Sequence, residues 1–502
     1  MLGKIFTFSF VTLLSRILGL ARDMLIAYTL GAQGLSDVFL AAFRLPALFR
    51  TYFSEGVLSM SFVPIYSKKL QDTQEAQRFA DQVFTGLLVF LLLLCFLLFV
   101  FTPKFLSVFA PGFLGSTYKF GLTVELVRIM LPYMLFVAIT SVIGGILQTH
   151  QCFYITALVP VILNVCMIVS ALCPHWSLPV YNFSVGVSCA GVIQFGMALY
   201  AVKRRNISVK LVRPRVDEEM RVFLKRSGMS LLSGCASQLS VWVNTIFASA
   251  IPGAITYFYY SDRVNQLPQS LVGISMSVVL MPTIAKLARG DDTRKMIEKQ
   301  NQALDLGLTL IVPSAAVLIA MAEPVLLALL HYGQFDYWAV GNTAPILSVL
   351  ATTLPAYVVC KILLMFFYAR GEFGIPAIFA VASLCASGAV SYVMMRFWGS
   401  VGIAVGSAVG TWLNAIFLMI YLRARNLYEF SDVLINKLSF VFLSATIMVV
   451  VLGMCSAILA PYLFQGALIK IVVIVLLLAV GVAVYLFTLC GIFRQQISVG
   501  DI

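Results

Sequence analysis

The sequence predicts an all-α polytopic membrane protein, and three observations support this prediction. Of the 502 residues, 61% are hydrophobic and 11% are charged, and the mean hydropathy is +0.98, which is far from the composition of soluble globular proteins. Apolar segments of about 20 residues, the length that a helix needs to cross a bilayer, recur along the whole chain. Basic side chains are concentrated in alternate connections between these segments.

About fourteen segments are long and apolar enough to be transmembrane helices. They are approximately residues 5–29, 37–66, 83–103, 122–149, 153–173, 180–202, 222–250, 254–285, 300–322, 341–369, 375–396, 402–423, 434–459 and 465–492. The second and the eighth segment each contain two prolines, so we expect kinks there. The first segment has no evident cleavage site after it and is expected to be retained as a helix.

The distribution of Lys and Arg predicts that both termini are cytoplasmic. With the N-terminus inside, twenty-three of the 34 basic residues fall in cytoplasmic segments and four fall in outside loops. This asymmetry follows the positive-inside rule. The net charge of +13 is therefore largely a topology signal, and nucleic acid is not an expected partner.

A weak internal repeat predicts two parallel six-helix lobes. When the chain is shifted by about 220 positions, the prolines and flanking residues of the second segment overlay those of the eighth, and the match continues over some 110 positions. Parallel repeats are related by an axis along the membrane normal and place a substrate site between the lobes. We therefore expect an N-lobe (1–205), a basic cytoplasmic linker (206–221), a C-lobe (222–426) around the same central cavity, and a C-terminal helix pair (427–502) outside the repeat.

Seven basic residues fall inside predicted spans, which points to an anionic ligand. They are Arg16, Arg22, Arg44, Arg50, Arg128, Arg263 and Lys361. A guanidinium in a bilayer core costs at least about 2.5 kcal/mol, so such residues usually face a wet cavity or a counter-charge. Arginine suits a phosphate or pyrophosphate because its planar fork donates paired hydrogen bonds to oxygens.

Three acids accompany the arginines of the first two spans. Successive helical residues advance by about 100°, so Asp37, Arg44 and Glu55 fall near one line of the second span, and Arg16 and Asp23 share a face of the first. Asp23, Asp37 and Glu55 are expected to hold the cavity arginines while no ligand is bound. The alternative is that each acid only pins two helices together.

The remaining candidates are the other three basic residues of the spans, the histidines and the cysteines. Arg263 follows Asp262 in the eighth span and is expected to join the cavity set. Arg128 is expected to be locally paired or to reach toward the interface, and the role of Lys361 stays open. The histidines lie near helix ends and the ten cysteines are scattered, so we expect no catalytic histidine, no metal and no cofactor.

Residues of the first two spans resemble a known family signature. The run Thr12-Leu-Leu-Ser-Arg-Ile-Leu-Gly-Leu-Ala-Arg-Asp23 is followed by Gly31-Ala32, Ser36-Asp37, Ala42-Phe43-Arg44-Leu45-Pro46, Arg50, Glu55-Gly56 and Phe62-Val63-Pro64. This pattern closely resembles the MurJ (MviN) family of lipid II flippases, within the multidrug/oligosaccharidyl-lipid/polysaccharide exporter group. The fourteen-span layout is similar to that family over the whole chain.

The resemblance implies translocation of lipid II, a lipid-linked peptidoglycan precursor, from the inner to the outer leaflet of the bacterial cytoplasmic membrane by alternating access. It implies that Arg16, Arg22, Arg50, Arg263 and Asp37 belong to the central cavity, that Asp23, Arg44 and Glu55 match family positions, and that the C-terminal pair forms a groove for the polyprenyl tail. The implied partners are lipid II, membrane lipids and the cell-wall synthesis machinery, with the chain acting as a monomer.

The sequence departs from the family pattern at one point, and several alternative functions stay open. Some members of the family bind sodium through carboxylates on the seventh and eleventh helices, but these segments here carry Gln238 and Asn244 and no acid. The alternatives are a multidrug-type antiporter, a flippase of another polyprenyl-pyrophosphate glycan, a membrane-embedded glycosyltransferase and a scaffold without transport. A cation exporter would favour an acidic site, and an enzyme would favour acid or histidine clusters in larger loops.

Overall fold

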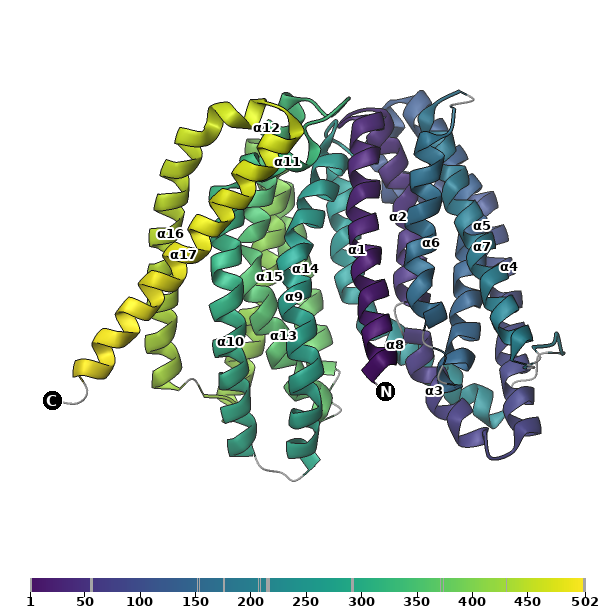
Figure 1. Ribbon diagram of the computed structural model, residues 1–502. Helices are drawn as coiled ribbons and strands as arrows, with labels where there is room; N and C mark the ends of the chain where they lie inside the picture. Colours follow the sequence, from purple (N-terminus) through teal and green to yellow (C-terminus); the bar gives the residue numbers. More distant parts are fainter. Residues whose placement is uncertain are drawn as a thin grey trace. The chain divides into compact units, whose positions relative to one another are not determined.

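Helices make up the fold in the part of the chain that the computed structural model describes (Figure 1). They are α1 (Leu2–Leu30), α2 (Leu35–Ser54), α3 (Val57–Lys69), α4 (Thr73–Phe109), η1 (Pro111–Gly115), α5 (Thr117–Thr149), α6 (Tyr154–Leu172), α7 (Pro179–Arg204), α8 (Glu218–Ala248), α9 (Ala254–Arg289), α10 (Thr293–Ala320), α11 (Ala322–Leu330), α12 (Tyr337–Ala351), α13 (Thr353–Ala369), α14 (Gly374–Trp398), α15 (Ser400–Ala424), α16 (Asp432–Leu459), η2 (Ala460–Phe464) and α17 (Ala467–Val499).

The structure describes every residue except 1, 55–56, 151, 153, 175–176, 206, 208, 214–216, 290–292, 371, 373, 430 and 500–502. Within the helices, it describes the backbone but not the side chains of 2–9, 52–54, 57–60, 73, 226, 229–237, 271, 273–283, 285–289, 293, 432–433 and 492–499.

The all-helical prediction is confirmed, and each predicted span coincides with one helix or with two consecutive helices. Among the described residues, ten helices are long and apolar enough to cross a membrane. The predicted spans outside this set include α1, α2 and α9, which carry the charged residues of the predicted cavity. The total of fourteen spans and the cytoplasmic placement of both termini stay predictions.

Polar caps and glycines fix several helix ends. The carboxylate of Asp72 accepts hydrogen bonds from the backbone N–H groups of Gln74 and Glu75 at the start of α4, and Asp217 caps α8 in the same way through Met220. An oxygen in this position satisfies N–H groups that have no partner within the helix. The turn between α1 and α2 contains Gly31 and Gly34 with φ of 68° and 60°, a conformation that favours glycine.

Packing divides the chain into two compact units, Met1–Thr256 and Tyr257–Ile502. In the first unit, an aromatic cluster joins α3, α4 and the start of α8, where the rings of Phe62 and Phe79 stack and Phe223 meets both edge-on. The predicted lobe boundaries at 205 and 222 stay predictions, while the packing places α8 with the first unit.

Small residues bring α14 and α15 together in the second unit. Gly402, Gly406 and Gly410 recur every fourth residue on α15, and a Cβ atom at Gly406 would lie 2.6 Å from the backbone nitrogen of Ser391 and 2.7 Å from the backbone oxygen of Ser387. Glycines with this spacing let two helix backbones approach closely in a membrane. The C-terminal helices α16 and α17 form a pair connected by η2, and α16 packs against α10 (Figure 1).

Candidate functional site

The first predicted cavity arginine is buried in a network of hydrogen bonds. Arg22 lies in α1 with 3% of its surface exposed, and its Nε and Nη2 atoms donate to Oδ1 of Asp23 at 3.0 and 2.6 Å. Its Nη1 atom donates to Oδ1 of Asn164 in α6 at 3.0 Å. The guanidinium also lies 5.9 Å from the ring centroid of Phe43 in α2. This buried arginine is thus neutralised by its neighbouring acid and oriented by a second helix.

Asn164 joins α6 to two points on α1. Its side-chain oxygen accepts from Arg22, and its side-chain nitrogen donates to the backbone oxygen of Ser15 at 2.9 Å. Its Nδ2 atom would lie 3.5 Å from a Cβ atom at Gly19, which is an ordinary contact distance. The amide therefore fits between successive turns of α1 and holds the guanidinium of Arg22 in place.

The second buried charge in this region is Asp37, in the first turn of α2. Its carboxylate is 1% exposed and accepts three hydrogen bonds, from the backbone nitrogen of Gly253 at 2.6 Å, the backbone nitrogen of Thr256 at 3.1 Å and the hydroxyl of Thr256 at 2.7 Å. These donors belong to the turn before α9 and to its first residues. Asp37 thus acts as an N-terminal cap supplied by another helix.

Arg44 follows Asp37 by seven residues and faces the same neighbouring segment. Its Nη1 atom donates to the backbone oxygen of Val241 at 3.2 Å and to the hydroxyl of Thr245, both in α8. Residues seven apart in a helix lie within about 20° of one line, which explains why both side chains of α2 contact the segment 241–256. The structure therefore brings Asp37 and Arg44 onto one face of α2.

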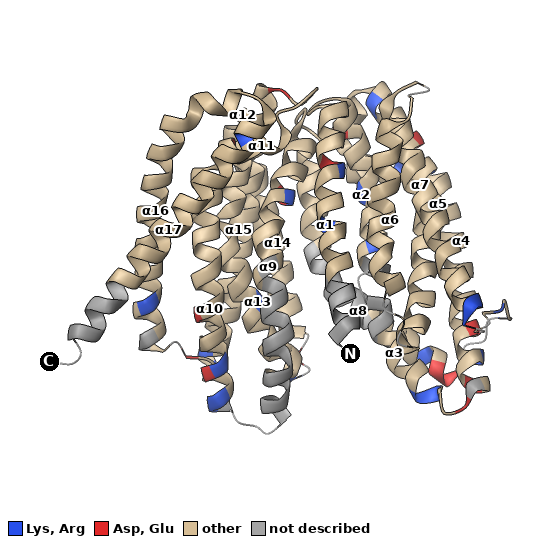
Figure 2. Ribbon diagram, viewed as in Figure 1, with Lys and Arg blue, Asp and Glu red and all other residues tan. Residues whose placement is uncertain are grey.

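The remaining predicted site residues have different surroundings. Arg16 is exposed on α1, and Arg50 is half-buried in α2. In the second unit, Arg263 is half-buried in α9, where its guanidinium lies 5.0 Å from the ring centroid of Tyr259 and donates to the hydroxyl of that residue at 3.3 Å. Glu55 lies outside the described residues. The charged positions of the helices are drawn in Figure 2.

The other two basic residues of the predicted spans, Arg128 and Lys361, lie beside aromatic rings. Arg128 in α5 donates from Nε to the backbone oxygen of Phe99 at 3.2 Å, and its guanidinium lies 4.9 Å from that ring centroid. The neighbouring acid Glu125 accepts instead from the hydroxyl of Tyr181 at 2.5 Å. Lys361 is exposed in α13, with its ammonium 5.7 Å from the ring centroid of Tyr357.

Two residues of this site, Asn164 and Thr245, were not predicted from the sequence. Both are uncharged and buried in their helices, and each meets an arginine far away in the sequence. A search for polar residues in the middle of apolar segments would have found Asn164, because an amide in such a place needs hydrogen-bond partners. Thr245 has no comparable signal, since a threonine can satisfy its own hydroxyl by bonding to the preceding turn.

In the second unit, the side chain of His331 lies beside the basic side chain of Lys470. The ammonium of Lys470, at the start of α17, lies 3.2 Å from Nδ1 of His331 and donates to the backbone oxygen of His331 at 3.3 Å. Burial and the nearby ammonium lower the pKa of His331 from 6.5, while Asp336 opposes this shift.

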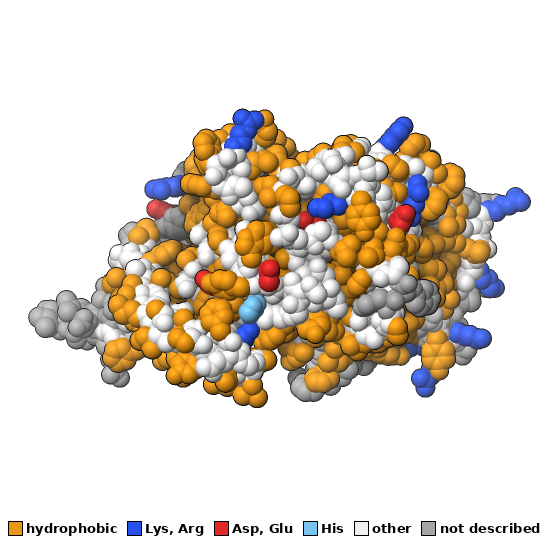
Figure 3. Space-filling view, turned by 90° about the horizontal axis from the view of Figure 1, so that it is seen from above, with side chains coloured by type: hydrophobic (Ala, Val, Ile, Leu, Met, Phe, Trp, Pro, Cys, Tyr) orange, Lys and Arg blue, Asp and Glu red, His pale blue; other side chains and the backbone are white. Residues whose placement is uncertain are grey.

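In the face seen from above, acidic and basic side chains are scattered among hydrophobic and uncharged surface (Figure 3).

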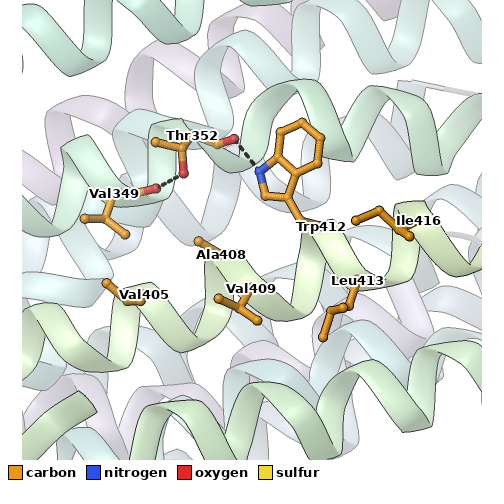
Figure 4. Close-up of a pocket in the computed structure, with 8 residues that line it drawn as sticks. All are labelled: Val349, Thr352, Val405, Ala408, Val409, Trp412, Leu413 and Ile416. Carbon is orange, nitrogen blue, oxygen red and sulfur yellow. Dashed lines mark hydrogen bonds between the residues drawn. The ribbon is translucent and has the colours of Figure 1, made fainter.

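An apolar hollow in the second unit carries no charge. Its volume is about 380 Å³, and its lining includes Val405, Val409 and Ile416 of α15. At one side, the indole nitrogen of Trp412 donates to the backbone oxygen of Thr352 at 3.1 Å, in the turn between α12 and α13 (Figure 4). The aliphatic residues of the lining offer only dispersion contacts to a ligand.

Solved structures of one class of membrane transporters share the fold of this chain. A solved structure of a lipid II flippase MurJ in an inward closed conformation matches with a TM-score of 0.81 at 23% sequence identity, covering 98% of this chain and 99% of the other. An inward-facing multidrug resistance MATE family transporter of the MOP superfamily matches with a TM-score of 0.69 at 17% identity, covering 82% and 94%. The helices thus have the fold that these transporters share.

The sequence identifies the family within this class. The family model described as "Lipid II flippase MurJ" matches residues 26–477. The probable lipid II flippase MurJ of Rickettsia prowazekii is 31% identical over 483 residues, covering 96% of this chain and 95% of that protein. The lipid II flippase MurJ of Burkholderia cenocepacia is 31% identical over 432 residues, covering 84% of each.

The chain therefore belongs to the MurJ lipid II flippase family, as the signature of its first two spans predicted. Its family and its apolar helices make it a multi-pass protein of the bacterial inner membrane. The family is one of transporters and not a class of catalysts.

Proposed function

We propose that this chain carries lipid II from the inner to the outer leaflet of the bacterial cytoplasmic membrane by alternating access, and so supplies precursor for cell-wall synthesis. The observation that carries the proposal is the set of arginines in α1 and α2, inside a chain whose family is named for lipid II transport. In this proposal, the pyrophosphate docks on Arg16, Arg22, Arg44, Arg50 and Arg263, and the sugar-peptide head group occupies the polar volume beside them.

The contacts of Arg22 suggest how such a site keeps its charge in the absence of substrate. Asp23 accepts two hydrogen bonds from the guanidinium, so a pyrophosphate oxygen would compete with one carboxylate oxygen for the same donors. Both acceptors make charge-assisted hydrogen bonds of similar strength. Exchange of one for the other would avoid a state in which the buried guanidinium is unpaired, which would be costly.

The other parts of the proposal concern Asp37, the C-terminal helices and the partners. Asp37 holds the start of α9 beside α2 through its three hydrogen bonds, and Asp23 and Glu55 act as the remaining cavity acids. The pair α16 and α17 accepts the polyprenyl tail. The protein works as a monomer with no covalent step, no cofactor and no metal, beside membrane lipids and the cell-wall synthesis machinery.

Complementation tests this function directly. A bacterium depleted of its own lipid II flippase is expected to grow when it expresses this chain, and to fail with Arg16→Ala, Arg22→Ala or Arg263→Ala at equal membrane abundance. Arg128→Ala is the matched control, because its guanidinium contacts only a backbone oxygen and a ring in the described structure. Failure of the expressed parent chain, or full rescue by all three variants, would refute the proposal.

A multidrug-type antiporter is the second candidate, since MATE transporters share the fold. Resistance to cationic dyes separates the two functions. If the chain protects a dye-sensitive strain and does not support growth of the flippase-depleted strain, the antiporter is correct.

A further inference from the structure

A polar cavity lies at the N-terminal end of α10, apart from the arginines described above. Its volume is about 730 Å³. Its charged and polar lining comes from Arg294, Glu298 and Asp305 of α10 and from Glu429, Ser431 and Lys437 of the connection to α16 and its first turns. Figure 2 marks acidic and basic positions of the ribbon at the lower end of α10. By the predicted topology, this end of α10 faces the cytoplasm.

Hydrogen bonds between α10 and the segment before α16 build the wall of this cavity. Asn301 of α10 accepts from the hydroxyl of Tyr428 at 2.6 Å and donates to the backbone oxygen of Glu429 at 2.9 Å. Lys437 donates to a carboxylate oxygen of Asp305 at 2.6 Å, and both side chains are about one quarter exposed. Tyr428, Glu429 and Lys437 are thus held against α10.

The charges of the lining favour a ligand that carries both signs. The cavity presents the two cationic groups of Arg294 and Lys437 and the three carboxylates of Glu298, Asp305 and Glu429. Lys437 and Asp305 pair with each other, so a ligand phosphate would share the ammonium of Lys437 with Asp305. A pyrophosphate or a purely anionic head group would meet an excess of negative charge here. A head group with a phosphate and a primary ammonium can instead pair each of its charges with an opposite one.

An apolar surface continues from the cavity along α10. Gln302 lines the cavity, and Leu306 and Leu310 follow it at intervals of four residues, with 58% and 55% of their surfaces exposed. Residues four apart lie above one another on a helix. An acyl chain attached to a head group in the cavity could therefore lie along these two leucines.

We propose that this cavity is a binding site for the head group of an ethanolamine phospholipid of the bilayer. The phosphate lies against Arg294 and Lys437, the ammonium lies against Glu298 and Glu429, and an acyl chain follows Leu306 and Leu310. Ethanolamine fits better than choline because its ammonium has N–H donors for the carboxylates. The site is independent of the proposed lipid II function.

Native mass spectrometry of the full-length protein tests the site. The delipidated protein in a non-ionic detergent is mixed with dioleoyl-phosphatidylethanolamine, -phosphatidylcholine or -phosphatidylglycerol at equal concentrations. We expect the ethanolamine lipid to bind about tenfold more tightly than the other two, in keeping with one or two additional charge-assisted hydrogen bonds. Arg294→Gln and Glu298→Gln should each remove most of this preference.

The controls separate the site from general effects on the protein. Both variants change exposed side chains, so the fold should persist, which size-exclusion chromatography checks. Arg423→Gln, an exposed change at the end of α15 outside the cavity lining, should leave the preference intact. Equal binding of the three lipids, a preference for phosphatidylglycerol, or an unchanged preference in both cavity variants would overturn the proposal. So would loss of polyprenyl-pyrophosphate binding in Arg294→Gln, which would assign the cavity to the transport substrate.

Discussion

The interface between α1 and α6 and the interface between α14 and α15 are held together by different forces. At the first, polar side chains bridge the helices, with Asn164 bound to the backbone oxygen of Ser15 and to the guanidinium of Arg22. At the second, glycines of α15 lie against the backbone of α14, and buried Ser387 and Ser391 face them. Each pair lies within one compact unit.

The difference indicates which interface a ligand can change. A hydrogen bond to an arginine can be exchanged for one to an anion with little change in the number of bonds, so the surroundings of Arg22 can respond to a substrate. Close backbone packing has no such exchange partner, because separating the helices loses dispersion contacts and opens a void. We therefore interpret α14 and α15 as a rigid pair and α1 with α6 as a pair whose contacts can be rearranged.

Adding a large side chain to the rigid pair should have the largest effect. Gly406→Leu would place atoms within the volume of Ser391 and Ser387, so the helices must separate, and we expect a loss of more than about 3 kcal/mol of stability. Thermal unfolding in detergent measures the loss. The matched control is Gly453→Leu in α16, where a Cβ atom meets nothing within 4 Å. Equal unfolding temperatures for the two variants would show that close packing does not hold the pair together.

Removing the cap of α9 should have the next largest effect. Asp37→Ala leaves two backbone N–H groups and the Thr256 hydroxyl without their buried acceptor, and we expect a loss of about 3 kcal/mol. The same unfolding measurement checks this value. Asp37→Asn keeps one acceptor oxygen and should lose less. If the alanine variant were as stable as the parent, the capping role would be wrong.

The fold was predictable from the sequence because each membrane span needs a long apolar segment, and such segments are visible without an alignment. The segment 341–369 was predicted as one span, and the candidate membrane span Tyr337–Ala369 agrees with this prediction. Within this span, a turn at Thr352 separates α12 from α13, and the sequence analysis did not predict this turn. The hydropathy of this segment stays high across the turn, so composition could not locate the break. The short helix α11 was missed because its nine residues are too few for a span.

The candidate site was predictable only in part. Charged residues such as Arg22 and Asp37 stand out in an apolar segment, so the sequence identifies them as important. Their partners do not stand out: Asn164 is 142 positions from Arg22, and the donors to Asp37 are mainly backbone groups. Backbone donors exist at every helix start, so only the tertiary structure can show which one a carboxylate reaches.

Replacing the bridging amide tests the polar interface itself. Asn164→Leu keeps the number and branching of the side-chain heavy atoms but loses the bonds to Arg22 and Ser15, leaving a buried guanidinium with one partner fewer. We expect a loss of about 2 kcal/mol of stability, together with reduced growth in the flippase-depleted strain. Gly19→Ala is the control, because its Cβ atom would lie at an ordinary distance from Asn164. A stable Asn164→Leu variant that supports full growth would contradict a positioning role for this residue.

The smallest expected effect is a pH dependence of stability that arises from the contact between His331 and Lys470. Because the pKa of His331 is lowered in the folded protein by burial and by the ammonium of Lys470, protonation is more favourable in the unfolded chain. The stability from the neutral ring is complete above pH 6.5 and is lost as the pH falls through the lowered pKa. The unfolding temperature should therefore fall between pH 7.5 and pH 5, and less steeply in His331→Gln.

A second histidine makes the comparison between variants necessary. The pKa of His150 is also lowered, by burial and by the charge of Arg205, so the parent protein loses stability at low pH from both residues. His150→Gln should reduce the pH dependence by a separate amount, and the two reductions should add because each histidine lies in a different compact unit. If His331→Gln has the same pH dependence as the parent, the contact with Lys470 does not respond to protons, and only the arginine contacts of the first unit would count as exchangeable.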